Sequence, residues 1–339
     1  MKTLNPLFVS LFLILTACSG PSIQKFQGMT QGTSYHISYW SESPVDAAAI
    51  KKAVEAELER IDQLLSNYRD DSVIEQFNKN RTTEAQETDS EIIDLIRIAQ
   101  SVHKESQGCY DLTIKPFFEL WGFREDVLAI PSDEQIQLTL ARSGLDKLKV
   151  IDDTHLQKLH PELTVDVSSI AQGYTVETVS HIFEAQGIKH YLVEIGGELK
   201  TNGHKPDQQA WRIAVERPVP GKQTVQKIIT TPKDLPTAIM TSGTYRHYFD
   251  ADGKRYSHIL DARTGRPVTH DLVSVTVIHP NPTIADAWST ALLCMGREEG
   301  LKAANAQKLS ALFIEQKDDK LIETQSEFLD GSIFSSAPK

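Results

Sequence analysis

The sequence predicts an α+β fold on the basis of how strand-like and helix-like segments are ordered along the chain. The second half contains a run of apolar, β-branched segments separated by turn residues, which is typical of consecutive strands: "HYLVEIGG", "WRIAVERP", "QKIITT", "AIMTSG", "YSHILDA" and "LVSVTVIHP". Helical spacing occurs only at intervals, mainly in the first half and near residue 290. Runs of strands with interspersed helices favour α+β over a strictly alternating α/β fold.

The first half begins with a predicted strand in "MTQGTSYHISYW". A helix is expected over 46–65, because its apolar residues recur at helical spacing; they are Ile50, Val54, Leu58, Ile61 and Leu65. "SNYRDDSVIEQFN" reads as a turn and a short helix, and Ser90 begins another amphipathic helix. "KLKVIDD" and "TVDV" are expected to be strands between residues 147 and 167.

The second half begins with a helix from about Ser169 to Ala185, followed by Gly187 as a C-terminal stop. After the run of strands comes a helix containing "TIADAWSTALL", and then a strand in "SALFIEQ". The sequence has no repeat at a fixed period, no low-complexity tract and no interior linker. It therefore gives no internal domain boundary.

The N-terminus has the layout of a bacterial lipoprotein signal. A lysine precedes an apolar run from Pro6 to Ala17, which is too short for a comfortable transmembrane helix. "LTAC" resembles a lipobox, in which Cys18 becomes the acylated first residue of the mature chain, carrying palmitate-type chains. We expect a signal peptide at 1–17, a lipid-anchored tether at 18–26 and a folded domain at 27–337, located in the cell envelope and facing the periplasm.

Charge and cysteine content exclude some functions. The chain has 35 basic and 46 acidic residues and a formal net charge of -11, and no basic stripe, which argues against a nucleic-acid partner. No CxxC or Cys/His cluster is present, which argues against zinc or iron–sulfur chemistry. Cys109 and Cys294 could pair in an oxidising compartment, but their apolar neighbours favour buried free thiols.

Three oxygen-bearing side chains share one face of the helix near residue 290. Asp286, Ser289 and Thr290 are related by i, i+3 and i, i+4 spacing. One interpretation is that Thr283 caps the helix and Asp286 complements its dipole. The other is a hard-cation site, because magnesium prefers oxygen ligands. Taken alone, these residues favour the capping interpretation.

Several other motifs lie at the ends of predicted strands. Gly196 and Gly197 follow one strand, and a turn or a close approach to a ligand would explain them equally well. "SHILDARTGRP" contains His258 and Asp261, "VDVSSIAQGY" leads from a strand into a helix, and "GCYDLTIKPFFELWGF" is rich in aromatics. Each has an ordinary structural explanation when considered alone. Together they supply hard oxygen ligands, glycines, aromatics and a histidine, a set suited to a diphosphate ligand held by magnesium.

These motifs, in this order, resemble the ApbE family of lipoprotein flavin transferases (FAD:protein FMN transferases). Seven segments carry the resemblance: "SNYRDDSVIEQFN", "YDLTIKPFFELWGF", "VDVSSIAQGYTVE", "VEIGGELKTNG", "TSGTYRHYF", "SHILDARTGRP" and "ADAWSTAL". The resemblance implies a T-fold-like α+β domain with mixed or antiparallel sheets packed against helices. It also implies Mg²⁺-dependent transfer of FMN from FAD to a Thr or Ser hydroxyl of a protein, with release of AMP.

Site residues follow from the resemblance position by position. His258 is the candidate general base. Ser169, through its backbone carbonyl, would surround the metal together with Asp286, Ser289 and Thr290. The FAD site would contain Gln31, Tyr68, Cys109, Tyr110, Asp111, Asp166, Gln172 and Leu260.

Three positions depart from the family pattern. Gln31 replaces the usual methionine of Met-Gly-Thr, which removes an apolar contact with the flavin. Gln172 stands where many relatives carry Lys or Glu, which removes a charge from the nucleotide site. Ser289 replaces the second carboxylate of some relatives and leaves Asp286 as the only anionic ligand on the helix.

Two alternative activities use the same residues. One is a magnesium-dependent FAD pyrophosphatase, in which water replaces the protein hydroxyl and gives FMN and AMP. The other is a lipid-tethered FAD-binding protein without catalytic activity. For the transferase, the resemblance implies acceptor subunits of respiratory flavoprotein complexes such as the sodium-translocating NADH:quinone reductase.

Overall fold

A computed structural model describes residues 22–219, 224–318 and 320–336. The expected signal peptide and Cys18 lie outside these residues. Within them, no helix is both long and apolar enough to cross a membrane. The first strand, β1, begins at Gln24, so regular structure starts inside the segment 18–26 that we assigned to a tether.

One large sheet of eight strands forms the centre of the molecule. All neighbouring strands in this sheet are antiparallel. This arrangement confirms the α+β fold. The strands are, in sheet order, β1 (Gln24–Thr30), β2 (Thr33–Trp40), β6 (His190–Ile195), β7 (Glu198–Asn202), β10 (Thr237–Gly243), β15 (Leu272–His279), β16 (Ser310–Lys317) and β17 (Lys320–Gln325).

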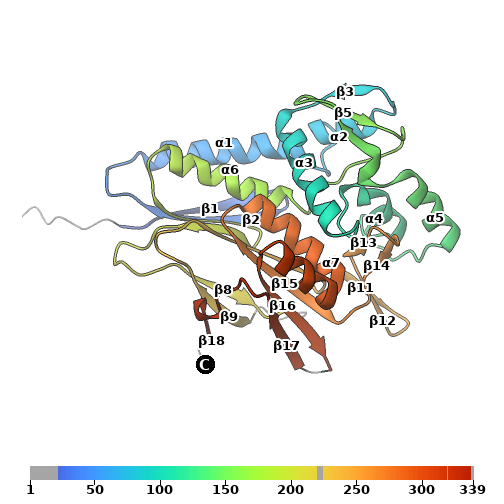
Figure 1. Cartoon of the computed structure of the whole chain (residues 1–339). Coiled ribbons are helices and arrows are strands. Elements are labelled where there is room, and N and C mark those ends of the chain that lie inside the picture. The colour runs from blue at the N-terminus through green and yellow to red at the C-terminus, as the bar shows by residue number, and fades with distance from the viewer. Residues whose placement is uncertain (1–21, 220–223, 319, 337–339) are drawn as a thin grey trace, which may run out of the picture.

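Three long helices pack against this sheet and against one another: α1 (Ala47–Leu65), α6 (Ala171–Ala185) and α7 (Pro282–Ala306). Figure 1 shows α1 and α6 lying side by side above the first strands. Helix α1 forms as expected, with Asp46 as its N-cap and with Ile50, Val54, Leu58 and Ile61 buried on one face.

The remaining elements form smaller units around the sheet. Four helices lie together at one end of the molecule (Figure 1): α2 (Val73–Lys79), α3 (Ser90–Glu105), α4 (Lys115–Trp121) and α5 (Asp133–Arg142). Three short 3₁₀ helices are η1 (Leu112–Ile114), η2 (Leu145–Lys147) and η3 (Gly331–Ile333). Two small sheets have three strands each: β3 (Ala85–Glu87), β5 (His155–Lys158) and β4 (Leu148–Val150) form one, and β18 (Phe334–Ser336), β9 (Val225–Thr230) and β8 (Arg212–Glu216) form the other. Two further sheets have two strands each: β11 (Tyr248–Ala251) pairs with β12 (Lys254–Ser257), and β13 (Leu260–Asp261) pairs with β14 (Arg266–Pro267).

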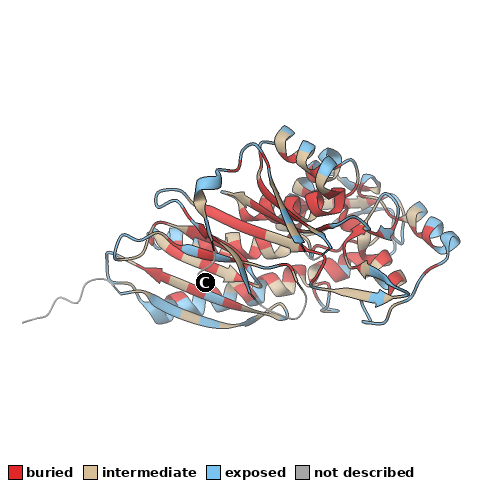
Figure 2. Cartoon of the chain, turned by 90° about the horizontal axis from the view of Figure 1, so that it is seen from below, coloured by how far each residue is buried: buried red, intermediate tan, exposed pale blue. Residues whose placement is uncertain are grey.

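The main core lies between the large sheet and its covering helices. Figure 2 shows buried residues concentrated in the sheet and on the inner sides of the helices. Tyr39, Phe183 and Tyr191 are fully buried here and pack ring against ring. A second, smaller apolar cluster combines Phe117 and Trp121 of α4 with Leu260 of β13. This smaller cluster fixes one wall of the site described below.

"MTQGTSYHISYW" forms a hairpin rather than the single strand that we expected. Thr30 of β1 pairs with Thr33 of β2, which leaves Gln31 and Gly32 as a two-residue turn. Both have positive φ, 48° and 73°, the geometry of the tight turns that join antiparallel strands. The hairpin was missed because the usual sequence signals for such a turn are Asn-Gly and Asp-Gly, whereas this turn is Gln-Gly.

The expected strand in "TVDV" is wrong, because two asparagine side chains and the carbonyl oxygen of Leu112, rather than a neighbouring strand, satisfy this backbone. Val165 N donates to Asn78 Oδ1 at 2.7 Å, and Val167 N donates to Asn67 Oδ1 at 2.9 Å. Both asparagine amides also donate to the carbonyl oxygen of Val165. Segment 165–167 is therefore extended and buried without belonging to a sheet.

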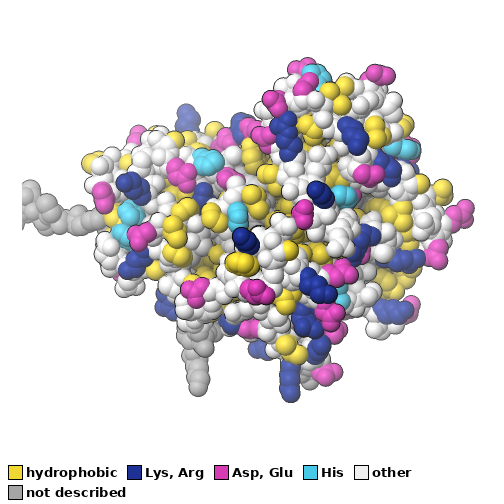
Figure 3. All heavy atoms as spheres, viewed as in Figure 1, with side chains coloured by type: hydrophobic (Ala, Val, Ile, Leu, Met, Phe, Trp, Pro, Cys, Tyr) yellow, Lys and Arg dark blue, Asp and Glu magenta, His cyan; other side chains and the backbone are white. Residues whose placement is uncertain are grey.

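Acidic and basic side chains are interspersed on the face of the molecule shown in Figure 3. Many charges form surface ion pairs, such as Arg69 with Glu59 and Asp62. On this face, charges of one sign do not gather into a single large patch. Surface pairs of this kind contribute little to stability.

Candidate functional site

A cavity of about 290 Å³ lies where α7, the loop after α3, the end of β10 and the start of β13 meet. A second cavity of about 680 Å³ adjoins it and shares Tyr68, Ser168 and Gln172 with it. Most of the residues that the sequence assigned to a site line one of the two. The first cavity contains Cys109, Tyr110, Asp111, Ser169, His258, Leu260, Asp286 and Thr290, and the second contains Gln31.

Asp286 does not act as part of a helix cap. The N-cap of α7 is Asn281, whose side chain accepts from Ile284 N at 2.8 Å, while Thr283 Oγ1 donates to Glu177. The capping interpretation with Thr283 is therefore wrong. Asp286 Oδ2 instead accepts from Gly173 N of α6 at 2.8 Å, and its Oδ1 has no hydrogen-bond partner among the described residues. One carboxylate oxygen thus remains available at the cavity.

The two hydroxyls of α7 differ in their surroundings. Thr290 lines the cavity, with its Oγ1 3.0 Å from Ser242 Oγ. Ser289 is fully buried, and its hydroxyl contacts the carbonyl oxygen of Asp286 at 2.9 Å and Ser242 Oγ at 2.7 Å. Ser169 joins Asp286 and Thr290 at the cavity. Ser289, which precedes Thr290 on α7, contacts Ser242 instead of lining the cavity.

Two buried acidic side chains, Asp286 and Glu198, line the cavity. Burial raises the pKa of Asp286 to about 7. Burial, followed by the charge of Asp286, also raises the pKa of Glu198 well above its ordinary value. Glu198 accepts from Thr241 N at 3.0 Å and lines the same cavity. The positive charge of Arg246, in the same cavity, partly offsets the rise at Glu198. A buried acidic pair that is costly to ionise without a cation, together with hydroxyl and carbonyl oxygens, fits a hard divalent cation such as Mg²⁺.

His258 is held in one tautomer. Its Nδ1 lies 2.9 Å from the carbonyl oxygen of His247, which can only accept, so Nδ1 carries the proton. In the neutral ring Nε2 is then an unprotonated acceptor. Burial lowers the pKa of His258 to about 4, so the ring is neutral near pH 7. Asp261, three residues further along the same motif, does not contact the ring and binds Arg263 at 2.8 Å.

Tyr110 and Asp111 are positioned by their own loop. Asp111 is buried and accepts from Thr113 N at 2.7 Å and from Leu145 N at 2.8 Å, which starts η1 and fixes the following segment. Tyr110 is also buried, which raises its pKa, and its hydroxyl lies 3.2 Å from Ser169 Oγ. Both residues therefore stabilise the cavity wall in addition to lining it.

Tyr68 contrasts with these residues because its side chain is 84% exposed beside both cavities. Arg124 lies over its ring, with the guanidinium carbon 5.9 Å from the ring centre. An exposed aromatic ring at the edge of a cavity provides a flat surface for a planar ligand.

The remaining nucleotide-site candidates lie at the junction of the cavities. Asp166 Oδ1 accepts from Ser168 N at 2.9 Å, and Asp166 lines a small third cavity with Tyr68 and His258. Gln172 packs against Gly196, where a Cβ would lie 2.4 Å from its Nε2. Gly196 and Gly197 have positive φ and form the two-residue turn between β6 and β7, which confirms the turn explanation of this glycine pair. Gln31 Nε2 donates to Thr175 Oγ1 at 3.0 Å.

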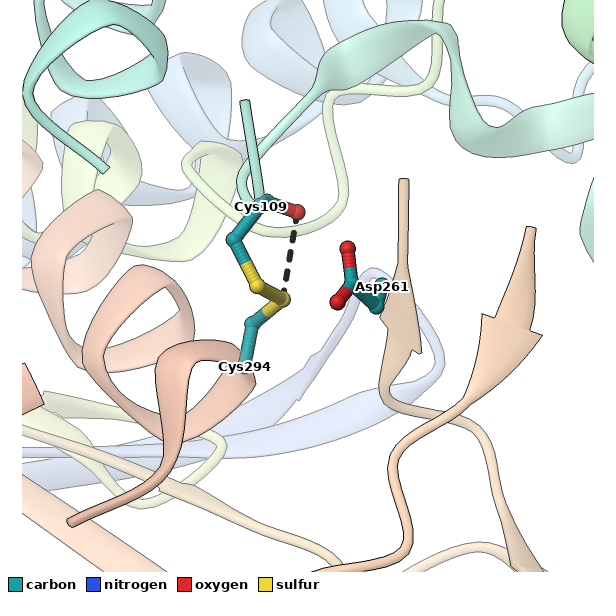
Figure 4. Close-up of side chains that lie close together, drawn as sticks. All are labelled: Cys109, Asp261 and Cys294. Atoms are coloured by element: carbon teal, nitrogen blue, oxygen red, sulfur yellow. Dashed lines mark hydrogen bonds between the residues drawn. A yellow bond between two sulfur atoms is a disulfide. The ribbon is translucent and has the colours of Figure 1, made fainter. Parts of the chain in front are cut away.

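Cys109 and Cys294 form a disulfide, with their Cα atoms 6.0 Å apart. The interpretation as free thiols is therefore wrong. Apolar burial does not distinguish a thiol from a disulfide, and only the fold brings together residues separated by 185 positions. Figure 4 shows Asp261 beside the bridge. These three residues do not form a metal site, because the two sulfurs are bonded to each other and neither can act as a thiolate ligand.

Three residues of the site were not identified from the sequence: Glu198, Ser242 and Arg246. Each lies within a segment that carries the resemblance, "VEIGGELKTNG" or "TSGTYRHYF", but none was assigned a role. Arg246 is the only lysine or arginine that lines the first cavity within the described part of the chain. Its Nη2 lies 3.8 Å from Glu216 Oε2, and its guanidinium lies beside Gly197.

Comparisons with known proteins identify relatives along almost the whole chain. The model of the ApbE family matches residues 31–313. FAD:protein FMN transferase of Vibrio cholerae is 38% identical over 320 residues, 93% of this chain and 94% of that protein. The Escherichia coli K12 protein of the same name is 35% identical over 86% of this chain and 84% of its own length.

Solved structures give the same result for the fold. The flavin transferase ApbE from Vibrio cholerae superposes with a TM-score of 0.82 at 36% identity, covering 91% of this chain and 98% of that one. The flavinyl transferase ApbE from Pseudomonas stutzeri, solved in its apo form, gives a TM-score of 0.84 at 35% identity, covering 92% and 97%. The resemblance in the seven motifs is thus confirmed, and this chain belongs to the ApbE family.

Proposed function

We propose that this protein transfers FMN from FAD to a threonine or serine hydroxyl of a target protein through a phosphoester bond, with release of AMP. The main support is the position of His258 in the same cavity as Asp286 and Thr290. This arrangement combines a base with an unprotonated Nε2 and a set of hard oxygen donors. The relatives named FAD:protein FMN transferase support the choice of substrate.

The chain's own residues account for the steps of such a reaction. The acceptor hydroxyl attacks the phosphorus of the FMN half of FAD, and His258 Nε2 takes its proton. The bond from that phosphorus to the oxygen bridging to AMP breaks, and AMP leaves with this oxygen. Arg246 lies in the same cavity and can donate hydrogen bonds to phosphate oxygens. Tyr68 offers its exposed ring to a planar part of the dinucleotide.

Asp286, Thr290 and the backbone carbonyl of Ser169 would hold a magnesium ion. Bound Mg²⁺ neutralises charge on a diphosphate and orients it for in-line attack. The available oxygen of Asp286 makes this set suitable for a cation, and a bound cation would favour the ionised forms of Asp286 and Glu198, which burial otherwise disfavours. Ser289 completes the set that the resemblance implies, although its hydroxyl contacts Ser242 in this structure.

For its location, we propose a lipid-anchored protein of the bacterial cell envelope that faces the periplasm. The lipobox-like "LTAC" ending at Cys18 supports the anchor. The Cys109–Cys294 disulfide supports an oxidising compartment, because such bridges persist outside the cytoplasm. Acceptors there would be flavoprotein subunits of respiratory complexes such as the sodium-translocating NADH:quinone reductase.

The decisive experiment is the intact mass of a flavin-free acceptor subunit after incubation with this protein, FAD and Mg²⁺. We expect an increment of covalently bound FMN, an equal amount of AMP, and neither product with EDTA. FMN and AMP in solution without an increment on the acceptor would indicate the pyrophosphatase. Tight FAD binding without AMP would indicate a binding protein. The His258→Ala variant serves as the matched control for background reaction.

A further inference from the structure

The disulfide connects two walls of the candidate site. Cys109 lies in the loop between α3 and η1, and Cys294 lies on α7. Asp286, Thr290 and Cys294 are spaced i, i+4 and i+8, so they lie along one stripe of the helix. All three, and Cys109, line the same cavity. The bridge is therefore attached directly to the helix face that carries the expected metal ligands.

The loop that carries Cys109 also contacts the other part of the predicted metal site, at Ser169. Next to Cys109, the hydroxyl of Tyr110 lies 3.2 Å from Ser169 Oγ. The loop around Cys109 thus contacts Ser169 on one side, by this hydrogen bond, and α7 on the other, by the disulfide. It spans the distance between the two parts of the predicted metal site.

Hydrogen bonds join this loop to its own segment, to Ser169 and to Ala262, whose N donates to the carbonyl oxygen of Cys109 at 3.4 Å. Cys109 N donates to Ser106 O at 3.2 Å, and His103 Nδ1 lies 2.8 Å from the carbonyl oxygen of Tyr110. Within the described residues, no conventional hydrogen bond joins segment 106–111 to α7. Cys294 Sγ lies 3.2 Å from the carbonyl oxygen of Cys109, but a disulfide sulfur has no proton to donate (Figure 4). The covalent bridge is thus the main connection.

Helix α7 is interrupted just after the bridge. Gly296 has φ of 75° and ψ of 175°, which are not helical, and a Cβ at this position would lie 2.9 Å from the His270 ring. The half of α7 that carries Asp286 and Thr290 therefore ends within two residues of Cys294. The regular helical backbone is broken at Gly296, so a cross-link at Cys294 fixes the end of the segment that carries Asp286 and Thr290.

We propose that the Cys109–Cys294 disulfide is a positioning element of the transfer reaction. It holds the Asp286–Thr290 stripe at the correct distance from Ser169 and Tyr110, so that the oxidised protein binds the metal and FAD diphosphate together. Gly173 N still holds Asp286 in the reduced protein, so reduction weakens the site without abolishing it. The inference rests on the proposed function for its catalytic consequence, but not for its effect on binding.

Reduction of the bridge by a dithiol is a balanced two-electron step. A thiolate of the reductant attacks one sulfur, the S–S bond breaks, and the released cysteine takes a proton. The second thiol of the reductant then displaces the remaining cysteine, which also becomes a thiol, and the reductant leaves as its own disulfide. Because both cysteines are almost completely buried and line the cavity, a bound dinucleotide covers the approach to them.

Binding linkage provides a test that does not depend on turnover. If the oxidised form binds FAD more tightly, FAD must in turn favour the oxidised form. In a dithiothreitol redox buffer at equilibrium, we expect FAD with Mg²⁺ to raise the fraction of protein that keeps the disulfide, measured by alkylation of free thiols and intact mass. We also expect the reduced protein, desalted without oxygen, to bind FAD more weakly in the presence of Mg²⁺. Equal FAD affinity of the two forms would overturn the proposal.

Kinetics then separate positioning from simple stabilisation. For the reduced protein at 25 °C we expect a higher Mg²⁺ requirement and a higher KM for FAD, with kcat lower by roughly tenfold, since small displacements at a reaction centre are costly. Reoxidation should restore all three values. If the disulfide only stabilises the fold, its reduction should lower the melting temperature and leave these three constants unchanged. In that case the positioning role is excluded.

Variants complete the experiment. The Cys109→Ala, Cys294→Ala double variant should resemble the reduced protein and should not respond to dithiothreitol. Met295→Leu, a buried neighbour on α7 that does not line the cavity, is the matched control and should respond to the reductant as the parent protein does. If the oxidised parent protein transfers no FMN, the proposed function is wrong. The FAD affinities of the oxidised and reduced forms and the alkylation of free thiols still test whether the disulfide positions the binding site.

Discussion

His258 Nδ1 lies 2.9 Å from the carbonyl oxygen of His247. Since a carbonyl oxygen can only accept, this contact places the ring proton on Nδ1 and leaves Nε2 free to accept a proton. In many hydrolases and transferases a carboxylate plays this orienting role. Here a backbone carbonyl does, and the nearby Asp261 binds Arg263 instead. The orientation of the base is therefore independent of the charge of a neighbouring side chain.

Replacing His258 with alanine should lower kcat by about 10²- to 10⁴-fold, because the acceptor hydroxyl loses its general base. The fold should remain intact, which circular dichroism and the melting temperature would show. His258→Gln is a useful comparison, since it can keep a hydrogen bond to His247 O but cannot take a proton. Comparable turnover by His258→Gln and the parent protein would exclude His258 as the base.

The pH dependence follows from the lowered pKa of His258, about 4. The base is neutral above this value, so kcat/KM should fall on the acid side only as pH approaches 4, rather than near 6.5. The free energy of unfolding should also fall on the acid side. Between pH 6.5 and 4 the imidazole of His258 is protonated in the unfolded chain but not in the folded one, so the unfolded state gains stability as pH falls through this range. Pre-steady-state rates and denaturant titrations over this range would test both. A rate profile that His258→Ala leaves unchanged would contradict the assignment.

Asp286→Asn should abolish turnover at ordinary Mg²⁺ concentrations, since it removes the anionic ligand while an amide oxygen can still accept from Gly173 N. Burial raises the pKa of Asp286 to about 7, so its ionised form destabilises the metal-free fold above that pH. In EDTA at pH 8, the variant should therefore melt at a higher temperature than the parent protein. FAD binding without Mg²⁺ should be retained.

Ser289→Ala is the matched control on the same helix. Its hydroxyl contacts Ser242 and the carbonyl oxygen of Asp286, away from the cavity lining. We expect a change of less than about tenfold in the Mg²⁺ concentration that gives half-maximal rate, compared with a loss of turnover for Asp286→Asn. An equal loss in both variants would show that Ser289 binds the metal directly, as the family resemblance implies.

The elements of the fold were predictable where the apolar pattern was long and periodic. Helix α1 and strand β15 are examples, because their buried positions follow a helical period and a run of β-branched residues respectively. Segment 165–167 was mistaken for a strand, because an apolar extended segment has the same composition whether a strand or side chains satisfy its backbone. Only the positions of Asn67 and Asn78 distinguish the two cases, and these residues are distant in sequence.

The site was predictable to a similar extent. The shared helix face of Asp286 and Thr290 suggested a cation site, but alone it favoured a cap, and the motif of His258 alone had an ordinary structural explanation. Only the resemblance of the ordered motifs assigned these three residues to a site, and the structure brings them to one cavity. Glu198 and Arg246 come from different strand ends and face the cavity only after the sheet forms. The disulfide depends on a contact between residues 185 positions apart, for which a single sequence carries no signal.

Arg246 should contribute to binding of the diphosphate, since it is the only lysine or arginine that lines the first cavity in the described part of the chain. Arg246→Met should weaken FAD binding by roughly ten- to a hundredfold, which corresponds to about 1.5–3 kcal/mol for hydrogen bonds to a charged group. Arg246→Lys should recover part of this loss, because it restores the charge but not the paired donors. Isothermal titration with FAD and with riboflavin, which has no phosphate, would locate the effect, and equal losses for both ligands would place Arg246 away from the diphosphate.

Glu75 and Lys115 form a buried ion pair at 2.5 Å, which supports the segment carrying Asp166. Burial alone would raise the pKa of Glu75, but hydrogen bonds from Lys115, Asn67 and Asn78 outweigh it and hold the pKa below its ordinary value. Lys115→Met leaves a buried charge without its partner, and should destabilise the fold by about 3–5 kcal/mol. The double variant Glu75→Gln, Lys115→Met removes the charge and should be less destabilised than Lys115→Met alone. Denaturant unfolding of the single and double variants would measure the coupling, and additive effects would show that the pair does not act as a unit.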